Sequence, residues 1–131
     1  MAIVDGEHEE LLSARVAILA TNGRDGRPQL SPVWFLVEDD LIKISVTAAR
    51  QKTRNLSRDA RCTFLAFHPS SANYYIEVRD EAALRPDPDY SFADRIGAKY
   101  QADLRDFDAP DDSRVVVTIT PSRVNIIDVR D

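Results

Sequence analysis

The sequence is poor in the residues that build covalent or metal-based active sites. It holds one cysteine, two histidines and four glycines in 131 residues. A lone cysteine cannot form a disulfide framework, which is typical of a reducing cytoplasm. Cys62 lies in a predicted strand and is interpreted as a buried, unreactive thiol. His8 and His68 lie far apart without metal-ligand spacing, so no metal site is expected.

Long apolar runs and an excess of basic residues are also missing. No apolar run approaches the roughly 20 residues of a membrane helix, and the first residues lack the basic and apolar regions of a signal peptide. With 22 acidic and 17 basic residues the net charge is −5, which disfavours general nucleic-acid binding. We therefore expect a cytoplasmic protein without membrane or nucleic-acid partners, folded as one domain over residues 1–131.

Recognisable catalytic motifs are absent too. There is no nucleophile elbow and no P-loop, because Gly23 and Gly26 belong to the stretch NGRDG, a strong hairpin-turn signal. The acidic pairs at 39–40 and 111–112 lie in turns or loops, where nothing marks one member as desolvated. No catalytic residue can be assigned, so any chemistry would depend on a bound cofactor.

The pattern of apolar residues predicts a mainly β protein of the α+β class. Residues 41–47, LIKISVT, alternate between apolar and polar side chains as in a half-buried strand. Apolar residues on both faces of 27–38 and 114–120 favour a closed or nearly closed barrel of six or seven antiparallel strands. The predicted strands are 15–21, 27–38, 41–47, 60–67, 74–85, 114–120 and 123–129, and the predicted short helices are 5–14, 49–58 and 90–102.

A basic segment interrupts this acidic chain. Five of the 17 basic residues and only one of the 22 acidic residues lie between Arg50 and Arg61. A solvated helix face is one interpretation. The other is an anion site, because Arg50 and Lys52 fall in the first helical turn, where the helix dipole disfavours cations but free N–H groups bind phosphate. We expect the Lys52 side chain to face solvent.

The stretch DGRPQLSPVWFLVEDDLIKISVTAARQKTRNLSRDARCTFLAF and the later YYIEVRDEAAL resemble a known family. The chain is similar, from about residue 10 to 128, to the flavin and deazaflavin oxidoreductases of the pyridoxamine 5′-phosphate oxidase-like superfamily. It most resembles the actinobacterial branch that uses coenzyme F-420. This resemblance implies an FMN-binding-type split β-barrel and a homodimer with two cofactor sites at its interface. One departure is Asp80, where the family often has glycine.

The resemblance also implies which residues contact the cofactor. The strand segment Leu30, Ser31, Pro32, Val33 and Trp34 would lie along the ring, and Val46 and Thr47 would flank it. Arg50 and Lys52 would bind the phosphate, with Asn55 nearby, and Asn73 and Tyr75 of the partner subunit would close the site. Trp34 has a second interpretation as a core or interface residue, and one of the neighbours Tyr74 and Tyr75 should be buried.

Three hypotheses for function follow from these observations. The first is a reductase that uses reduced F-420 to transfer a hydride to a small electrophilic acceptor, such as an activated alkene, a quinone or a tetrapyrrole-like molecule. The second is an FMN-dependent oxidoreductase on the same fold. The third is a cofactor-binding or carrier module without turnover.

Overall fold

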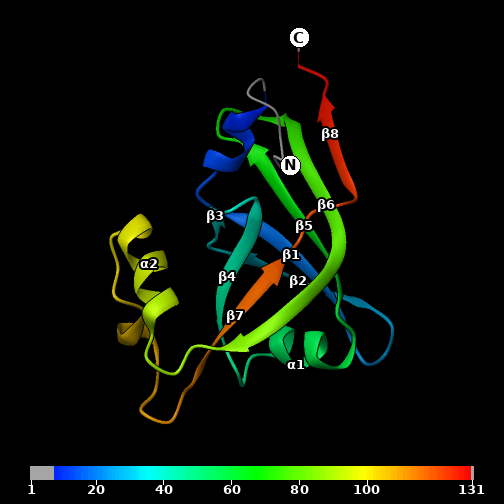
Figure 1. The fold of residues 1–131 in the computed structure, drawn as a ribbon. Coiled ribbons are helices and arrows are strands. Elements are labelled where there is room, and N and C mark those ends of the chain that lie inside the picture. Colours follow the sequence, from blue (N-terminus) through cyan, green and yellow to red (C-terminus); the bar gives the residue numbers. More distant parts are fainter. Residues whose placement is uncertain (1–7, 131) are drawn as a thin grey trace.

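The chain folds into eight strands over the described residues, which are 8–130 of this computed structural model (Figure 1). All strand pairs are antiparallel, in the order β2-β1-β5-β6-β7-β4-β3, and β8 pairs with β6. The strands are β1 (Ala17–Asn22), β2 (Pro28–Val33), β3 (Leu36–Glu38), β4 (Leu41–Thr47), β5 (Arg61–His68), β6 (Ser71–Pro86), β7 (Arg114–Ile119) and β8 (Val124–Asp128). The helices are α1 (Gln51–Arg58) and α2 (Ser91–Tyr100), with the short 3₁₀ helices η1 (Glu9–Ser13) and η2 (Leu104–Phe107).

The long strand β6 joins the two halves of the barrel. Its first part pairs with β5 and β8, where Glu81 is the last residue opposite β5 and lies across from Arg61. From Ala82 onward it pairs with β7 instead, so the strand bends from one sheet into the other. Figure 1 shows this curved strand running along most of the barrel. The predicted split-barrel architecture is confirmed, with one strand more than the six or seven expected.

The predicted single strand over residues 27–38 is wrong. It is two strands, β2 and β3, which pair with different partners, β1 and β4. The chain leaves the ladder at Trp34 and Phe35, where α2 supplies the missing backbone hydrogen bonds. The Tyr100 hydroxyl accepts from the Phe35 N–H at 3.1 Å, and the Lys99 ammonium donates to the Phe35 carbonyl at 2.7 Å. A long apolar run therefore crosses from one sheet to the other.

The turn at Asp39 and Asp40 and the buried face of α2 lie close to where the sequence predicted them. Asp39 and Asp40 both have left-handed φ, 53° and 60°, as a tight hairpin turn requires. Of the predicted helix 5–14, residues 5–7 lie outside the described residues, and the described part contains the 3₁₀ helix η1. In α2, Phe92, Ile96 and Tyr100 are buried as predicted, whereas Ala98 is exposed.

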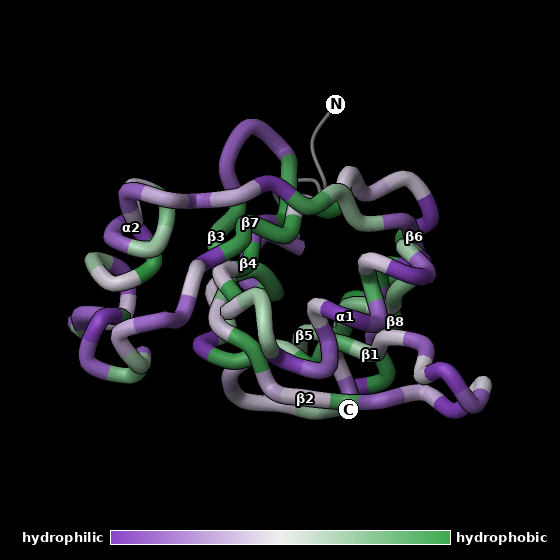
Figure 2. Tube along the Cα trace, turned by 90° about the horizontal axis from the view of Figure 1, so that it is seen from below, coloured by the Kyte–Doolittle hydropathy of each residue, from purple (hydrophilic) through white to green (hydrophobic). Residues whose placement is uncertain are grey.

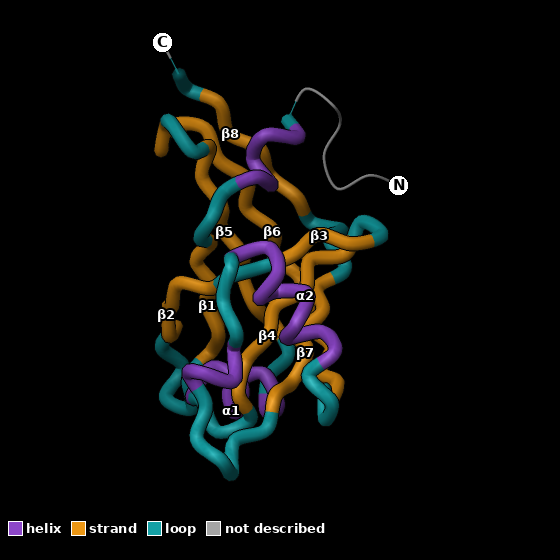
Figure 3. The backbone as a smooth tube through the Cα atoms, turned by 90° about the vertical axis from the view of Figure 1, so that its left-hand side faces the viewer, coloured by secondary structure: helices purple, strands orange, loops and turns teal. Residues whose placement is uncertain are grey.

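The main core fills the barrel, and a smaller one lies under α2. The alternation predicted for β4 is confirmed, with Ile42, Ile44 and Val46 buried against the main core. Figure 2 shows hydrophobic residues gathered in the strands at the centre and hydrophilic ones in the outer loops. Phe92, Ile96 and Tyr100 form the second cluster with Val116 of β7. Figure 3 shows α2 against the side of the barrel and α1 at its lower end.

Candidate functional site

The start of α1 is fixed where β4 ends and β7 begins. The backbone N–H of Ala48 donates to the Ser113 carbonyl at 2.8 Å, which ties the two strand ends together. The Thr53 hydroxyl donates to the Thr47 carbonyl at 2.7 Å and holds the first helical turn against the end of β4. The first N–H groups of α1 therefore have a defined position and no preceding helical carbonyl to bond.

A cavity of about 300 Å³ opens beside this helix start. Four residues predicted to contact the cofactor line it together, namely Val46, Thr47, Arg50 and Lys52. Its remaining lining residues are Ser45, Ala49, Phe107, Asp108, Asp112 and Arg114. The structure thus brings the predicted phosphate-binding cations and the predicted ring-flanking residues of β4 to one place.

Lys52 differs from the sequence-based expectation, because its side chain is buried instead of facing solvent. The residue is only 7% exposed, yet it lines the cavity together with Arg114, the first residue of β7. Within residues 8–130 no carboxylate or carbonyl pairs with its ammonium. Burial, together with the nearby Arg50 and Arg114, lowers the pKa of Lys52. A buried cation without a partner is unfavourable, and a bound anion would relieve that penalty.

Arg114 is a third cation at this cavity, and the sequence analysis missed it. It is 9% exposed, and its guanidinium donates to both carboxylate oxygens of Asp108, at 2.8 Å and 2.5 Å. The Tyr90 hydroxyl also donates to Asp108, at 2.7 Å. These bonds, led by that of Arg114, lower the pKa of the Asp108 carboxyl despite its burial. In the sequence Arg114 only opens the strongly apolar strand RVVVTI, so nothing there signalled this pairing.

Asn55 lies one turn further along α1 and is fully buried. Its amide nitrogen donates to the Thr21 hydroxyl of β1 at 3.1 Å, and its carbonyl oxygen accepts from the Gln51 side chain at 2.8 Å. Both ends of the amide are therefore occupied within the chain, and the residue holds α1 on the barrel. Its predicted contact with a cofactor stays a prediction.

The predicted ring-contacting residues of β2 are not in the lining of this cavity. Leu30 is 62% exposed and Pro32 is exposed, whereas Val33 is buried in the core. The Ser31 hydroxyl is buried and has no hydrogen-bond partner in the described chain. Trp34 is half-buried and stacks on Tyr100 with ring centroids 4.4 Å apart, which favours its interpretation as a packing residue.

The ring of Trp34 does not line the cavity itself but contacts Phe107, which does. The Trp34 and Phe107 rings are in edge contact with their centroids 6.2 Å apart, and Phe107 is 67% exposed.

Asn73 and Tyr75, predicted to come from the partner subunit, lie on the first part of β6, at the opposite end of the strand from α1 (Figure 1). Tyr74 is buried and Tyr75 is half-buried, as the alternation predicted.

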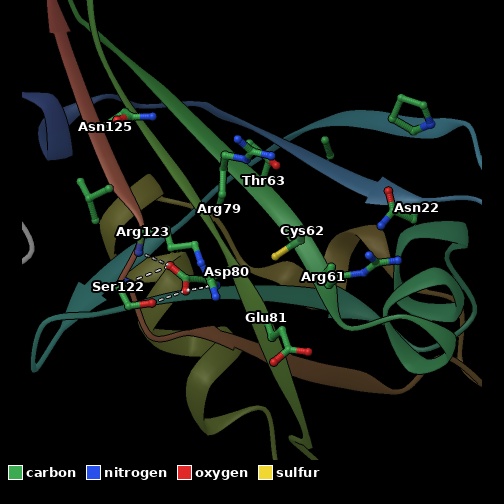
Figure 4. A pocket seen from close by; sticks show the side chains of 13 residues that line it. Asn22, Arg61, Cys62, Thr63, Arg79, Asp80, Glu81, Ser122, Arg123 and Asn125 are labelled. Carbon is green, nitrogen blue, oxygen red and sulfur yellow. Dashed lines mark hydrogen bonds and ion pairs between the residues drawn. The ribbon is translucent and has the colours of Figure 1, made fainter.

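A larger open groove of about 890 Å³ lies on the other half of the molecule (Figure 4). None of the predicted cofactor residues lines it. At its floor Asp80 accepts from the backbone N–H groups of Ser122 and Arg123, at 2.8 Å and 3.1 Å. The departure noted at Asp80 thus has a structural role, because its carboxylate fixes the turn that precedes β8. The groove also contains Arg61 and Arg79, and the Arg61 guanidinium is already paired with Asp59.

Among residues 8–130 there is no group of three or more His, Cys, Asp or Glu side chains placed to hold a metal ion. Cys62 is buried as predicted, and burial raises its pKa to about 11. A thiol in this state is a poor nucleophile. No helix in the same residues is long and apolar enough to cross a membrane. The polar groups gathered at the α1 cavity are therefore the best candidates for ligand binding.

Comparison with known proteins places this geometry in a family. The family model for pyridoxamine 5′-phosphate oxidase matches residues 4–128. The chain belongs to the pyridoxamine 5′-phosphate oxidase family. Members of this family share an oxidoreductase-type fold and bind flavin-type cofactors, so the resemblance stated from the sequence is confirmed at the level of the superfamily.

Solved structures similar to this family member agree with the split barrel. An F420 reductase is 28% identical, with a TM-score of 0.80 over 93% of this chain and 98% of that one. A conserved hypothetical protein from Mycobacterium tuberculosis is 25% identical, with a TM-score of 0.74 over 97% and 86% of the two chains. General Stress Protein 26 from Bacillus anthracis is 18% identical, with a TM-score of 0.69 over 92% and 91%, and supports the fold alone.

Proposed function

We propose that this protein is a reductase that uses reduced coenzyme F-420 to transfer a hydride to a small electrophilic acceptor. The observation that carries the proposal is that Arg50 and Lys52, two cations without a carboxylate partner among residues 8–130, lie at a cavity beside the start of α1. The similarity to an F420 reductase supports the choice of the deazaflavin. Activated alkenes, quinones and tetrapyrrole-like molecules are the acceptor classes that we expect.

The residues of the cavity fit the phosphate of such a cofactor. Arg50 and Lys52 would hold it together with the first N–H groups of α1, and Val46 and Thr47 would flank the cofactor where β4 ends. When bound, the reduced deazaflavin supplies the hydride. The chain's own contribution is to fix the position of cofactor and acceptor and to exclude water. No side chain is assigned as proton donor, and the proton would come from solvent.

FMN is the alternative cofactor, because the same cations would also hold its phosphate and the family binds flavin-type cofactors. A carrier module without turnover would use the same cavity. These alternatives differ in which ring binds and in whether an acceptor is reduced. They share the prediction that Arg50 and Lys52 dominate the affinity.

The test is to titrate F-420 and FMN into the protein and follow ring fluorescence. We expect F-420 to bind more tightly than FMN. Lys52→Ala and Arg50→Ala should each weaken F-420 binding by about 10-fold to 150-fold, the value of one charge-assisted hydrogen bond to phosphate. Arg54→Ala is the matched control, since Arg54 is exposed on α1, donates to Gln51 and is not in the cavity lining.

Each result of the titration decides one part of the proposal. If FMN binds more tightly than F-420, the proposed cofactor is wrong and the proposed phosphate site stands. If Lys52→Ala and Arg50→Ala both bind F-420 within about twofold of the unmodified protein, the proposed phosphate site is wrong. Mixing the loaded, reduced protein with a panel of acceptors then separates a reductase from a carrier, because only a reductase oxidises the cofactor at an accelerated rate.

We further propose that the protein acts as a homodimer through the outer face of the sheet made by β2, β1, β5, β6 and β8. Cross-strand partners share a face of a sheet, and two rows of partners here are largely apolar. One row holds Pro32, Ile18 and Leu65, and the other holds Phe67, Tyr75 and Ile127. These side chains are exposed or half-buried in the single chain.

The same face carries charges of both signs, which suits pairing with a second copy. Glu77 and Arg79 follow each other on the outer side of β6, opposite Leu65 and Thr63. In a two-fold assembly the Glu77 of one copy can approach the Arg79 of the other, because a two-fold interface brings the same patch together twice. Leu30, Pro32 and Tyr75 then lie at the interface, where the resemblance expects the cofactor ring.

A further inference from the structure

The charges around the α1 cavity balance to a single positive charge. Arg50 and Lys52 contribute two cations without a carboxylate partner in the described chain, and both line the cavity. Because Lys52 is only 7% exposed, water screens its charge poorly. The charge therefore acts mainly on whatever fills the cavity. Arg114 adds a third positive charge at the same wall.

Two carboxylates in the lining of the cavity reduce this sum. Asp108 is bonded to Arg114 through both oxygens, so this pair is neutral as a unit. Asp112 has no cation bonded to it within the described part of the chain. Its carboxylate accepts from the backbone N–H of Ala109 at 2.8 Å, which holds it in the loop that lines the cavity. Three cations against two carboxylates leave one positive charge for the ligand.

We propose that the site is matched to a phosphodiester, which carries one negative charge, and discriminates against a phosphomonoester, which carries about two at neutral pH. This inference rests on the proposed function, because it concerns the same phosphate. The second charge of a monoester has no free cation left to neutralise it and lies in the field of Asp112. The phosphate of F-420 is a diester and that of FMN is a monoester, so the charge of the site would itself select between the two cofactors.

Deazariboflavin 5′-phosphate and its monomethyl ester test this directly. They share ring and side chain and differ in one methyl group and in the second negative charge. The second pKa of a phosphate monoester is about 6, so at pH 5.5 the monoester is mostly a monoanion like the methyl ester, whereas at pH 8 it carries one more negative charge. Unphosphorylated deazariboflavin serves as the reference, and the affinities are measured by ring fluorescence.

The expected result is a change in the ratio of the two dissociation constants with pH. From pH 5.5 to pH 8 the monoester should lose at least about fivefold in affinity relative to the methyl ester. The ratio at pH 5.5 measures any contact of the methyl group. The charged groups that line the cavity are Arg50, Lys52, Arg114, Asp108 and Asp112. A change in the charge of any of them acts more strongly on the dianionic monoester than on the methyl ester, so the same ratio is also measured in a variant that changes the site charge.

Asp112→Asn is the decisive variant, because the amide can still accept from Ala109. It should abolish or reverse the loss of monoester affinity at pH 8, because three cations against one carboxylate leave two positive charges for the ligand. Asp111→Asn should retain the loss, since Asp111 is exposed and not in the cavity lining. A constant ratio in the unmodified protein, or an unchanged pH dependence in Asp112→Asn, would overturn the inference. If neither phosphate compound binds more tightly than deazariboflavin, the proposed phosphate site itself fails and this inference fails with it.

Discussion

Lys52 combines a proposed binding role with a loss of stability at a single residue. Its ammonium is desolvated and lies near Arg50 and Arg114, which lowers its pKa from the ordinary value of 10.5. Burying an unpaired cation opposes folding, and natural proteins accept such penalties at binding sites. The sequence indicated the role of this residue through the local excess of basic residues. It did not indicate the burial, because α1 packs against β1 and β6, which are not adjacent to it in the sequence.

The first prediction is that Lys52→Met stabilises the protein without ligand while it weakens cofactor binding. The free energy of unfolding should rise by about 1 kcal/mol, measured by urea denaturation at pH 7. Because folding lowers the pKa of Lys52, the penalty is complete below the folded pKa and is relieved as the pH rises from there towards 10.5. The advantage of the variant should therefore shrink at alkaline pH. Arg54→Met, on the exposed side of α1, should show no such gain, and a less stable Lys52→Met would contradict the prediction.

The second prediction concerns the buried ion pair of Asp108 with Arg114, whose side chains are 4% and 9% exposed. Asp108→Asn should lower the free energy of unfolding by about 3 kcal/mol, because it leaves a buried guanidinium without its counter-charge. The pKa of Asp108 is lowered by folding, chiefly by Arg114, so its contribution is present above the ordinary value of 3.8 and is lost as the pH falls through the folded value.

Acid unfolding followed by circular dichroism checks this second prediction. The unmodified protein should lose stability more steeply than Asp108→Asn below pH 3.8. Asp106→Asn, a change of an exposed carboxylate in the same loop, serves as the control and should behave like the unmodified protein. Equal acid sensitivity of all three proteins would show that the ion pair does not contribute to stability.

At the scale of elements, the break between β2 and β3 marks the limit of sequence-based prediction. The strand boundaries of β4, β5, β7 and β8 agree with the prediction to within about one residue, because each is set by local alternation and turn residues. The stretch from Val33 to Leu36 is continuous in hydrophobicity, so local patterning favoured one strand. The hydrogen bonds that permit the break come from Lys99 and Tyr100, more than 60 residues away.

The third prediction tests this role of α2. Tyr100→Phe keeps the ring that stacks on Trp34 but removes the hydroxyl that bonds the Phe35 N–H. A buried N–H without a partner should lower the free energy of unfolding by about 1 to 3 kcal/mol. Urea denaturation of the apo-protein measures the loss. Tyr75→Phe is the matched control, because the half-buried Tyr75 hydroxyl has no hydrogen bond within residues 8–130. A loss no larger than that of the control would show that the break does not depend on α2.

At the scale of the whole molecule, the sequence predicted the barrel, and four of the twelve predicted cofactor residues line one cavity. Val46, Thr47, Arg50 and Lys52 meet within one chain because the strand-to-helix connection between β4 and α1 is local. The predicted residues of β2 and β6 do not join them, because β2 and the first part of β6 belong to the sheet with β1, β5 and β8, whereas β4 pairs with β3 and β7 (Figure 3). If the site is completed by a second copy, assembly and cofactor binding must be linked, since a ligand that binds only the assembled state stabilises it.

The fourth prediction tests that linkage with Leu65→Glu, a charge placed in the centre of the apolar outer face between Ile18 and Glu77. The unmodified protein should sediment at twice the 14.7 kDa of one chain at micromolar concentration. The variant should sediment as a single chain, because two like charges would be buried against each other across the two-fold axis. Ala98→Glu places the same charge at an exposed position of α2 and should remain dimeric.

Far-ultraviolet circular dichroism must show that both variants are folded. Cofactor affinity, measured on the same samples, should fall in Leu65→Glu and not in Ala98→Glu. An unmodified protein that sediments as a monomer would reject the dimer, whereas a monomeric Leu65→Glu with undiminished affinity would place the complete cofactor site within one chain.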